Sequence, residues 1–375
     1  GRYCWQWTIV ALLATLSGGC QHVQSLSKHL LLALLLLGFA DWAIAQSFEE
    51  KLLHWTQENL SPGFEKREFS AAALTVVKGG KLVLGATFGV ADADPPQIAS
   101  PIETRFRISS ITKVMTAVAV AQLLQSGEIV SLDDPANSYL RRIQLPENRG
   151  QAVTLHHLLT HSAGFDYSTY GMYAPVEGDD ESAKNPALLL PDYVRPAGEW
   201  AVYSNYGGAL LGVLVEDVSG ESLQEYFHNR LFNPLGMSQT ELPRARSTAS
   251  LAVPYQVSSH GVFTPLAVSD YSALMNLSMG IETTVVDMGR FLNFLLTGLA
   301  EDGSQILSPH YLELLREQRF TNHAAANGFG MILDVVRQTP TITMYMHNGA
   351  TPGFSSHMVV VPALNLGAFI SVGGQ

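Results

Sequence analysis

The chain has 375 residues, of which 47% are hydrophobic and only 15% are charged, so it can bury a large core and is not a disordered chain. This length fits one large domain or two smaller ones. The formal net charge is −11, and no run of Lys and Arg interleaves with aromatic residues, which argues against nucleic-acid binding. Both cysteines, Cys4 and Cys20, lie near the start, so the rest of the chain has no disulfide framework, thiolate nucleophile or cysteine zinc site.

Residues 1–45 are predicted to be a leader and signal region that forms no part of the fold. Lys28 supplies a positive start, Leu30–Ala40 an apolar core too short to span a bilayer comfortably, and Ala43–Ala45 a small-x-small cleavage signal. Cleavage after Ala45 would leave a chain that starts at Gln46. We therefore expect an exported protein, periplasmic or extracellular, whose cysteine-free body suits an oxidising compartment.

A second apolar run lies upstream, at Trp7–Leu16, and ends in LSGGC at Cys20. It faintly resembles a lipoprotein signal, but its leucine is one position too far from the cysteine, and the chain starts with Gly1. We interpret residues 1–27 as vector, mis-called start or partial-frame sequence. The alternative is a second anchor that attaches the protein to the membrane through its N-terminus. The sequence leaves the oligomeric state open.

The body begins and ends with strand patterns and has helix patterns between them. A hairpin is predicted from Ala71–Val77 and Leu82–Phe88, joined at Gly79-Gly80, which can adopt positive φ. The predicted helices are Ser110–Gln125, Thr154–Thr160, Gly207–Val218, Ser222–Leu231, Val285–Leu296 with a capping-box-like start at Thr284, and one opened by Ser308-Pro309. The C-terminal strands are predicted at Phe329–Val336, Thr341–His347, His357–Val361 and Leu366–Val372.

This order predicts an α/β (α+β) fold in which one antiparallel sheet, built from both chain ends, is flanked by helices and carries an inserted helical subdomain. The helix after Lys113 is apolar nearly all round and should be buried at the centre. The segment from Gly164 to Glu199 is rich in Tyr, Pro, Gly and Asp, and reads as a long irregular region that could wall a cleft.

The segment FRISSITK places Ser110 three residues before Lys113, at the start of this helix. Residues three apart share a helix face, and burial lowers the pKa of a lysine until it can act as a base towards a hydroxyl. The spacing alone is weak, because the same SxxK pattern recurs at Ser25–Lys28, and a capped helix start is the plain alternative.

Two further groups could complete such a site. Tyr203 and Asn205, two apart in WAVYSNYGG, could offer a phenol that shuttles a proton and an amide that holds a carbonyl. In HNGATPGF, His347 ends a strand, Gly349 allows a backbone to approach a ligand, and the N–H of Ala350 could donate to an oxyanion. Each group alone also reads as ordinary structure: a helix cap, or a strand-end histidine.

Together, SxxK, YxN and HxG in this order resemble the serine β-lactamase and penicillin-binding protein superfamily, in the branch of class C β-lactamases, D-Ala-D-Ala carboxypeptidases, D-aminopeptidases and esterases. TLHHLLTHSAGF and LFNPLGM are similar to further blocks of that family, and the resemblance runs from about Phe48 to the C-terminus. It implies a β-lactamase/transpeptidase-like domain over residues 46–375. Family members usually add a C-terminal helix after the last strand, so we expect this chain to be a fragment that stops before it.

The resemblance implies a serine hydrolase that forms an acyl-enzyme on a D-amino-acid peptide, ester or β-lactam-like substrate, small or peptidoglycan-derived, with no metal or cofactor. Ser110 would be the nucleophile, Lys113 its activating partner and Tyr203 the proton relay to the leaving group. The substrate-binding residues would be Asn205, His347, Gly349 and Ala350, with the backbone N–H groups of Ser110 and Ala350 as the oxyanion hole.

Two positions depart from the pattern. His347 stands where many members carry lysine, and with an ordinary pKa near 6.5 it would be mostly neutral at pH 7.5, so we expect a peptidase or esterase rather than an efficient β-lactamase. We also expect activity on carboxylate-bearing substrates to fall as His347 loses its proton near neutral pH. Ser109 precedes the nucleophile where glycine or alanine is usual.

Rival interpretations rest on other residues. His157 and His161 have the spacing of a helical zinc pair, but they lack the glutamate of HExxH and an obvious third ligand. THSAG at Thr160–Gly164 is one glycine short of the nucleophile elbow of an α/β-hydrolase and lacks a preceding β-branched strand. A non-catalytic penicillin-binding or peptidoglycan-sensing protein, and a class C β-lactamase, stay open as alternatives.

Overall fold

The computed structural model describes residues 45–175, 179–243, 250–267 and 270–374. The predicted leader and both cysteines therefore lie outside the described residues, apart from Ala45. Within the described ranges, no helix has both the length and the apolar character needed to cross a membrane.

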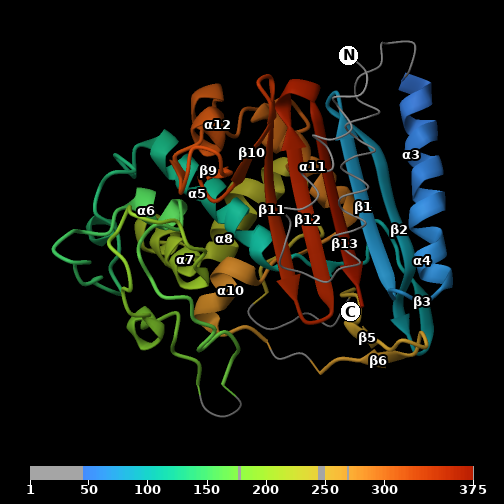
Figure 1. Ribbon diagram of the computed structural model, residues 1–375, viewed down its shortest axis with the longest axis horizontal. Helices are drawn as coiled ribbons and strands as arrows, with labels where there is room; N and C mark the ends of the chain where they lie inside the picture. Colours follow the sequence, from blue (N-terminus) through green and yellow to red (C-terminus); the bar gives the residue numbers. More distant parts are fainter. Residues whose placement is uncertain (1–44, 176–178, 244–249, 268–269, 375) are drawn as a thin grey trace.

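A nine-stranded antiparallel sheet forms the centre of the molecule (Figure 1). Its spatial order is β3-β2-β1-β13-β12-β11-β10-β9-β8, so the first strands and the last lie side by side. Strand β1 pairs with β13 from Ala71↔Gly373 to Lys78↔Leu366. The strands are β1 (Ala71–Lys78), β2 (Lys81–Ala93), β3 (Pro96–Ile98), β8 (Phe320–Thr321), β9 (Gly328–Phe329), β10 (Asp334–Thr339), β11 (Ile342–Thr351), β12 (Phe354–Val361) and β13 (Leu366–Gly373). The predicted sheet built from both chain ends is confirmed.

Helices cover both faces of the sheet and fill one side of the molecule (Figure 1). The α-helices are α3 (Ala45–Asn59), α4 (Ser61–Glu65), α5 (Thr112–Ser126), α6 (Leu155–Leu159), α7 (Asn205–Ser219), α8 (Leu223–Phe227), α9 (Asn233–Leu235), α10 (Ala273–Met279), α11 (Val285–Thr297) and α12 (Pro309–Arg316). Shorter helical turns are η2 (Ser109–Ile111), η3 (Ala136–Ser138), η4 (Pro186–Leu189), the π-turn η5 (His228–Phe232) and η6 (Pro362–Leu364). Two small ribbons, β4 (Phe106–Arg107) with β7 (Glu282–Thr283) and β5 (Tyr255–Val257) with β6 (Phe263–Pro265), complete the fold.

The apolar core has two parts, one on each face of the sheet. Leu52 of α3 packs with Leu74 of β1 and Ile370 of β13 on one face. On the other face, the larger part joins α11 to the helical subdomain of α5, α7 and α10. Nearly the whole length of α5 is buried, so it is the central helix that its composition predicts.

Several predicted elements differ from the structure in their bounds. The single strand predicted at Phe329–Val336 is wrong: the chain reverses between β9 and β10, with Ile332 at φ 69°. A β-branched residue is rarely found at positive φ, so its sequence pattern gave no sign of a turn. At Thr284 the cap is present but the capping box is not, because the Asp287 carboxylate instead accepts from Gln239 N at 2.8 Å. Helix α10 was not predicted.

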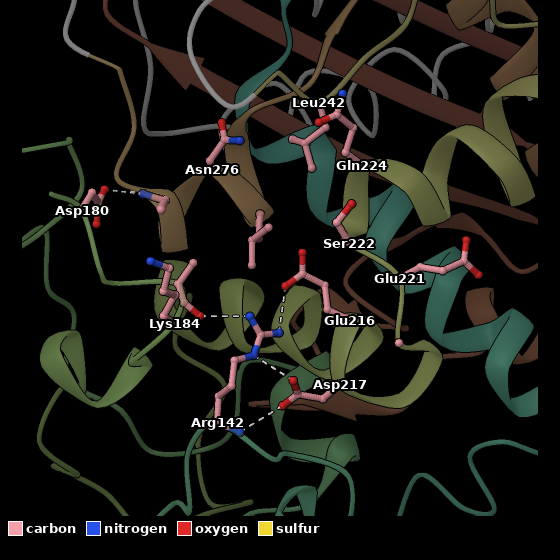
Figure 2. Close-up of a pocket in the computed structure, with 14 residues that line it drawn as sticks. Arg142, Asp180, Lys184, Glu216, Asp217, Glu221, Ser222, Gln224, Leu242 and Asn276 are labelled. Atoms are coloured by element: carbon pink, nitrogen blue, oxygen red, sulfur yellow. Dashed lines mark hydrogen bonds and ion pairs between the residues drawn. The ribbon is translucent and has the colours of Figure 1, made fainter.

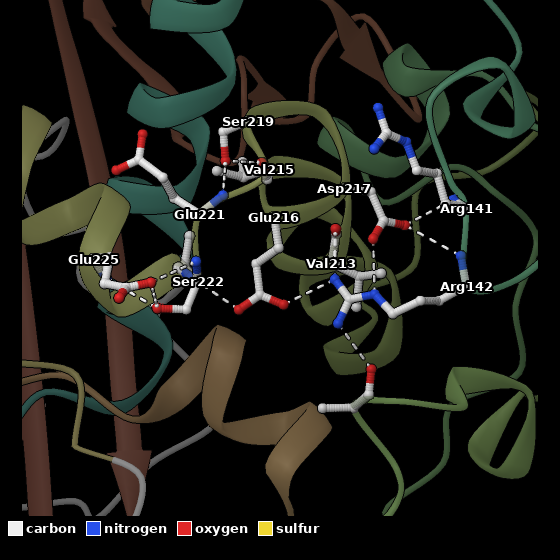
Figure 3. A network of polar contacts seen from close by, with 12 residues as sticks. Arg141, Arg142, Val213, Val215, Glu216, Asp217, Ser219, Glu221, Ser222 and Glu225 are labelled. Atoms are coloured by element: carbon white, nitrogen blue, oxygen red, sulfur yellow. Dashed lines mark hydrogen bonds and ion pairs between the residues drawn. The ribbon is translucent and has the colours of Figure 1, made fainter.

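A cavity of about 550 Å³ opens between the C-terminal end of α7, α8 and α10, away from Ser110 (Figure 2). The side chain of Arg142 lines this cavity. Its Nε donates to Asp217 Oδ1 at 2.8 Å, and its two terminal nitrogens donate to Glu216 Oε2 and to the Ala183 carbonyl. Glu216 in turn accepts from Leu223 N at 2.8 Å, which ties α7 to α8 (Figure 3). Every terminal nitrogen of Arg142 is therefore used within the protein, so this network is a structural brace.

Arg142→Leu should lower the free energy of unfolding by about 2 kcal/mol or more, because it leaves the buried Asp217 carboxylate without its cation. Urea titration of the purified protein measures this. Lys184→Met is the matched control, since Lys184 lines the same cavity but pairs with Glu181 in an exposed ion pair, which contributes little. Equal midpoints for both variants and the wild type would contradict the brace.

Candidate active site

Ser110 and Lys113 come together at the start of the buried helix. Ser110 lies in the 3-10 turn η2, and α5 begins at Thr112 rather than at Ser110 as predicted. The turn brings Ser110 Oγ to 2.9 Å from Lys113 Nζ. Lys113 also donates to the carbonyl of Ser278 on α10 at 3.2 Å. The unpredicted helix α10 therefore supplies a direct contact to the lysine.

The electrostatics of Lys113 favour a neutral amine. Its side chain has no exposed surface, and its two hydrogen-bond partners are a hydroxyl and a carbonyl, neither of which carries charge. Burial holds the pKa of Lys113 well below its usual range. A lysine that has lost its proton has a lone pair and can accept the proton of a nearby hydroxyl.

Gly208 makes the room for this lysine. A Cβ at Gly208 would lie 2.7 Å from Lys113 Cε and 2.8 Å from Cδ, which real side chains essentially never tolerate. Gly208 stands in the first turn of α7, three residues after Asn205. The pair of glycines in YSNYGG, inside an otherwise apolar helix, was the available sign of a close approach.

Tyr203 lies over Lys113 and between two histidine rings. Lys113 Nζ is 5.2 Å from the centre of the Tyr203 ring, and the ring centres of His161 and His347 lie 4.6 and 6.3 Å from it. The phenol oxygen is shut off from solvent and makes no full hydrogen bond within the described residues. Burial raises the pKa of Tyr203 above its usual value, and the neighbouring Ser110 hydroxyl opposes this only in part. Tyr203 therefore keeps its proton.

His161 belongs to the site, although the sequence offered it only as half of a zinc pair. It follows α6, has φ 56°, and its Nδ1 accepts from Ser204 N at 3.3 Å, beside Tyr203. Burial, followed by the neighbouring His347 and Lys113, lowers the pKa of His161 to about 3. His157 instead takes part in the capping box of α6 through Thr154, and the helix ends at Leu159. The two histidines are thus not on one helix face, as the zinc pair requires.

His347 on β11 is buried and holds one tautomer. Its Nδ1 lies 2.7 Å from the Asn348 carbonyl oxygen, which can only accept, so Nδ1 carries the proton and Nε2 keeps its lone pair. Burial is the main cause that lowers the pKa of His347 to about 3, and a positive charge on Lys113, when that lysine holds a proton, acts in the same direction. The expectation of an ordinary pKa near 6.5 is therefore wrong, because it ignored burial.

Gly349 and Ala350 place backbone amides beside the nucleophile. A Cβ at Gly349 would lie 2.0 Å from the Ile108 carbonyl oxygen and 3.3 Å from Ser110 N, so only glycine allows β11 this close to η2. The Ala350 carbonyl accepts from Ser109 Oγ at 2.8 Å. Because N–H and C=O of an extended residue point to the same side, the Ala350 N–H also faces η2. Strand β11 therefore presents a backbone N–H on the side where the nucleophile turn lies.

Asn205 is placed to bind a ligand, whereas Ser162 is a buried structural serine. Asn205 begins α7, and its buried Oδ1 has no partner within the described residues, so it is available to a ligand N–H. Ser162, from the THSAG segment, is fully buried, lies 2.8 Å from Thr160 Oγ1 and follows a helix. It has none of the strand-to-helix geometry of a nucleophile elbow.

Comparison with known proteins places this arrangement in a family. The family model described as beta-lactamase matches residues 56–374. The chain belongs to the beta-lactamase family. Among curated relatives, the chain is 27% identical over 288 residues to a protein named as a penicillin-binding protein, PbpX, of Bacillus subtilis, a match that covers 76% of this chain and 66% of PbpX. The chain thus spans just under two thirds of the length of that relative.

Solved structures show the same family fold. EstCE1, described as a hydrolase with promiscuous acyltransferase activity, superposes with a TM-score of 0.74 at 20% identity, over 87% of this chain and 94% of EstCE1. A class C beta-lactamase superposes with a TM-score of 0.70 at 21% identity, over 87% of this chain and 92% of that protein. The predicted β-lactamase/transpeptidase-like fold and the family resemblance are confirmed.

Gly208→Ala should lower the rate of acylation of Ser110 by about 10-fold or more, because the added methyl displaces Lys113 from Ser110 Oγ. Gly207→Ala is the matched control: its Cβ would lie 3.5 Å from its nearest neighbour, and alanine is the better helix former. Burst kinetics with a p-nitrophenyl ester, together with thermal unfolding midpoints, measure both effects. Equal burst rates in the two variants would show that Gly208 does not shape the lysine site.

Proposed function

We propose that this protein is a serine hydrolase that works through an acyl-enzyme at Ser110. One observation carries the proposal: a fully buried lysine with a lowered pKa lies 2.9 Å from a serine hydroxyl. The backbone amides of Ser110 and Ala350 would bind the oxyanion of the tetrahedral intermediate, which is supported by the close approach of Gly349 to Ser110 N and by the Ser109–Ala350 hydrogen bond.

The reaction follows from these positions in two halves. Ser110 Oγ attacks the acyl carbon while its proton passes to Lys113 Nζ, and the carbonyl electrons move onto the oxyanion. When the intermediate collapses, the bond to the leaving group breaks, and that group takes a proton through Tyr203, whose phenol is replenished from Lys113. Water then attacks the acyl-enzyme and gives a proton to Lys113. The second tetrahedral intermediate breaks its bond to Ser110 Oγ and releases the acid, and Lys113 returns its proton to that oxygen.

The charges around Ser110 favour a substrate without a carboxylate near the reacting bond. Burial lowers the pKa of both Lys113 and His347, which disfavours a positive charge on either, and the Nε2 of His347 presents a lone pair rather than a proton. Neutral esters and D-amino-acid amides therefore fit better than the anionic β-lactam of a class C β-lactamase, or than a peptide whose terminal carboxylate lies next to the reacting bond.

A non-catalytic penicillin-binding or peptidoglycan-sensing protein is the second candidate. Its supporting observation is that the Tyr203 hydroxyl makes no full hydrogen bond within the described residues, so the relay to the leaving group is not yet assembled. Such a protein would accumulate the acyl-enzyme without turnover. We also propose that residues 1–45 direct export to the periplasm or outside the cell, because an apolar core follows Lys28 and leads to a small-x-small motif.

Ser110→Ala should abolish covalent labelling by both a fluorescent penicillin and a p-nitrophenyl ester, as read by intact mass. Lys113→Met and Tyr203→Phe should each slow acylation by about 10²-fold or more, the usual effect of losing a general acid or base. Ser162→Ala is the control and should label like the wild type. Undiminished labelling of Ser110→Ala would overturn the assignment of the nucleophile, and a stable adduct without turnover in the wild type would favour the sensor.

The ratio of kcat/KM for a neutral ester to that for its carboxylate-bearing analogue should stay constant between pH 5.5 and 9. A protonated His347 would help the anionic substrate at low pH, but with its pKa lowered to about 3 the imidazole remains unprotonated over this whole range. Steady-state kinetics with both esters test this. A ratio that rises with pH around a midpoint near 6.5 would show that His347 titrates normally.

A further inference from the structure

Ser109, the residue before the proposed nucleophile, has a backbone conformation that its side chain does not favour. It is the first residue of η2, its φ is 47°, and it is buried. Non-glycine residues seldom adopt positive φ, and where they do, surrounding contacts hold them there, often at functional sites. Glycine would adopt this conformation without strain. A serine in this strained conformation therefore indicates that its side chain makes contacts that glycine could not make.

Both hydrogen-bonding capacities of the Ser109 hydroxyl are used. Ser109 Oγ donates to the Ala350 carbonyl at 2.8 Å, and Tyr271 Oη donates to Ser109 Oγ at 3.4 Å. The first bond joins the nucleophile turn directly to β11. It does so at the residue whose N–H faces η2, so a single hydroxyl links the two segments that carry the Ser110 and Ala350 amides.

The ring of Tyr271 is held in place by a neighbouring arginine. Its ring is buried, and the Arg107 guanidinium lies 5.2 Å from the ring centre. Arg107 is held in turn by Glu282, which has no exposed surface, through the paired ribbons β4 and β7. Buried contacts thus run from Glu282 to Arg107, from Arg107 to Tyr271, and from Tyr271 through the Ser109 hydroxyl to β11.

Among the described residues, no strand pairs with the outer edge of β11 beyond Met346. Strand β10 pairs with β11 only as far as Asp334↔Met346, so the segment from His347 to Thr351 has β12 on one side and η2 on the other. Without a neighbouring strand, the separation between the Ala350 N–H and the Ser110 N–H depends on contacts between β11 and η2. Within the described residues, the Ser109–Ala350 hydrogen bond is a buried polar contact of this kind.

We infer that Ser109 is a positioning residue that sets the spacing of the oxyanion hole, an inference that rests on the proposed hydrolase function. Because it joins the residue before Ser110 to Ala350 itself, the Ser109–Ala350 bond limits how far the two amides can separate. It acts on the transition state more than on substrate binding, because the ground-state carbonyl makes weaker use of the two donors. The strained backbone of Ser109, at φ 47°, is the conformation in which its hydroxyl makes this bond.

The test compares Ser109→Ala, which removes the bond and keeps the strain, with Ser109→Gly, which removes both. Each variant should lower kcat for a p-nitrophenyl ester by about 10-fold, less than the 10²–10³-fold typical of losing an oxyanion donor outright. KM should stay within about 2-fold, and the affinity for a boronic acid that forms a tetrahedral adduct should fall in parallel with kcat. Ser109→Gly should have the higher thermal midpoint of the two.

Ser70→Ala is the matched control, because Ser70 is a buried serine whose Oγ donates to the Gly373 carbonyl at 2.9 Å, away from Ser110. It should leave kcat unchanged. Unchanged kcat in Ser109→Ala would overturn the inference. The inference would also fail if Ser109→Gly had both the kcat of the wild type and a higher thermal midpoint than Ser109→Ala, because Ser109 would then have only a structural role. If the wild type forms no acyl-enzyme with ester or penicillin, the hydrolase proposal fails and this inference with it, whereas equal acylation of wild type and Ser109→Ala defeats the inference alone.

Discussion

The burial of one amine next to one hydroxyl is the constraint on which the rest of the site depends. An ammonium ion without a counter-charge is costly to bury, so burial lowers the pKa of Lys113 well below its usual range and favours the neutral amine. Apolar α5 removes the water, Gly208 on α7 leaves the space, and the Ser278 carbonyl on α10 orients the amine without supplying charge. Replacing that carbonyl by a carboxylate would restore the proton and remove the base.

The sheet contributes the backbone amide of the site, because the pairing between β10 and β11 ends before β11 does. Backbone N–H groups at an interior position of a sheet are normally taken up by the neighbouring strand. Here β10 stops at Met346 of β11, and the chain beyond it faces η2 instead of a strand. Gly349 lets the Ile108 carbonyl approach, and the extended backbone turns the N–H of the next residue towards η2. The oxyanion hole that we propose is thus a short stretch of sheet edge closed off by a helical turn.

The sequence predicts those features that depend on local pattern. The sheet from both chain ends, the buried helix and the pairing of Ser110 with Lys113 could be anticipated, because hydrophobic period, turn residues and a family resemblance agree on them. Features that depend on distant contacts could not. Ile332 takes positive φ in a stretch that reads as strand, and α10 lies in a region without a clear apolar period. The pKa of His347 is set by what covers it, which no local pattern records.

The three nitrogen bases around Tyr203 constrain one another, and this limits which proton transfers the site can perform. The charge of Lys113 would lower the pKa of both His161 and His347, and His347 lowers that of His161. A proton taken from Ser110 can therefore rest on one of them only, and Lys113, an intrinsically stronger base at 2.9 Å from Ser110 Oγ, is the group that receives it. With Lys113 charged, a phenolate at Tyr203 would be most stable, yet burial raises the pKa of Tyr203 in the resting site. Tyr203 thus begins the reaction as a phenol and becomes acidic only after the lysine has taken its proton. That order of events makes it a donor to the leaving group rather than the base that activates Ser110.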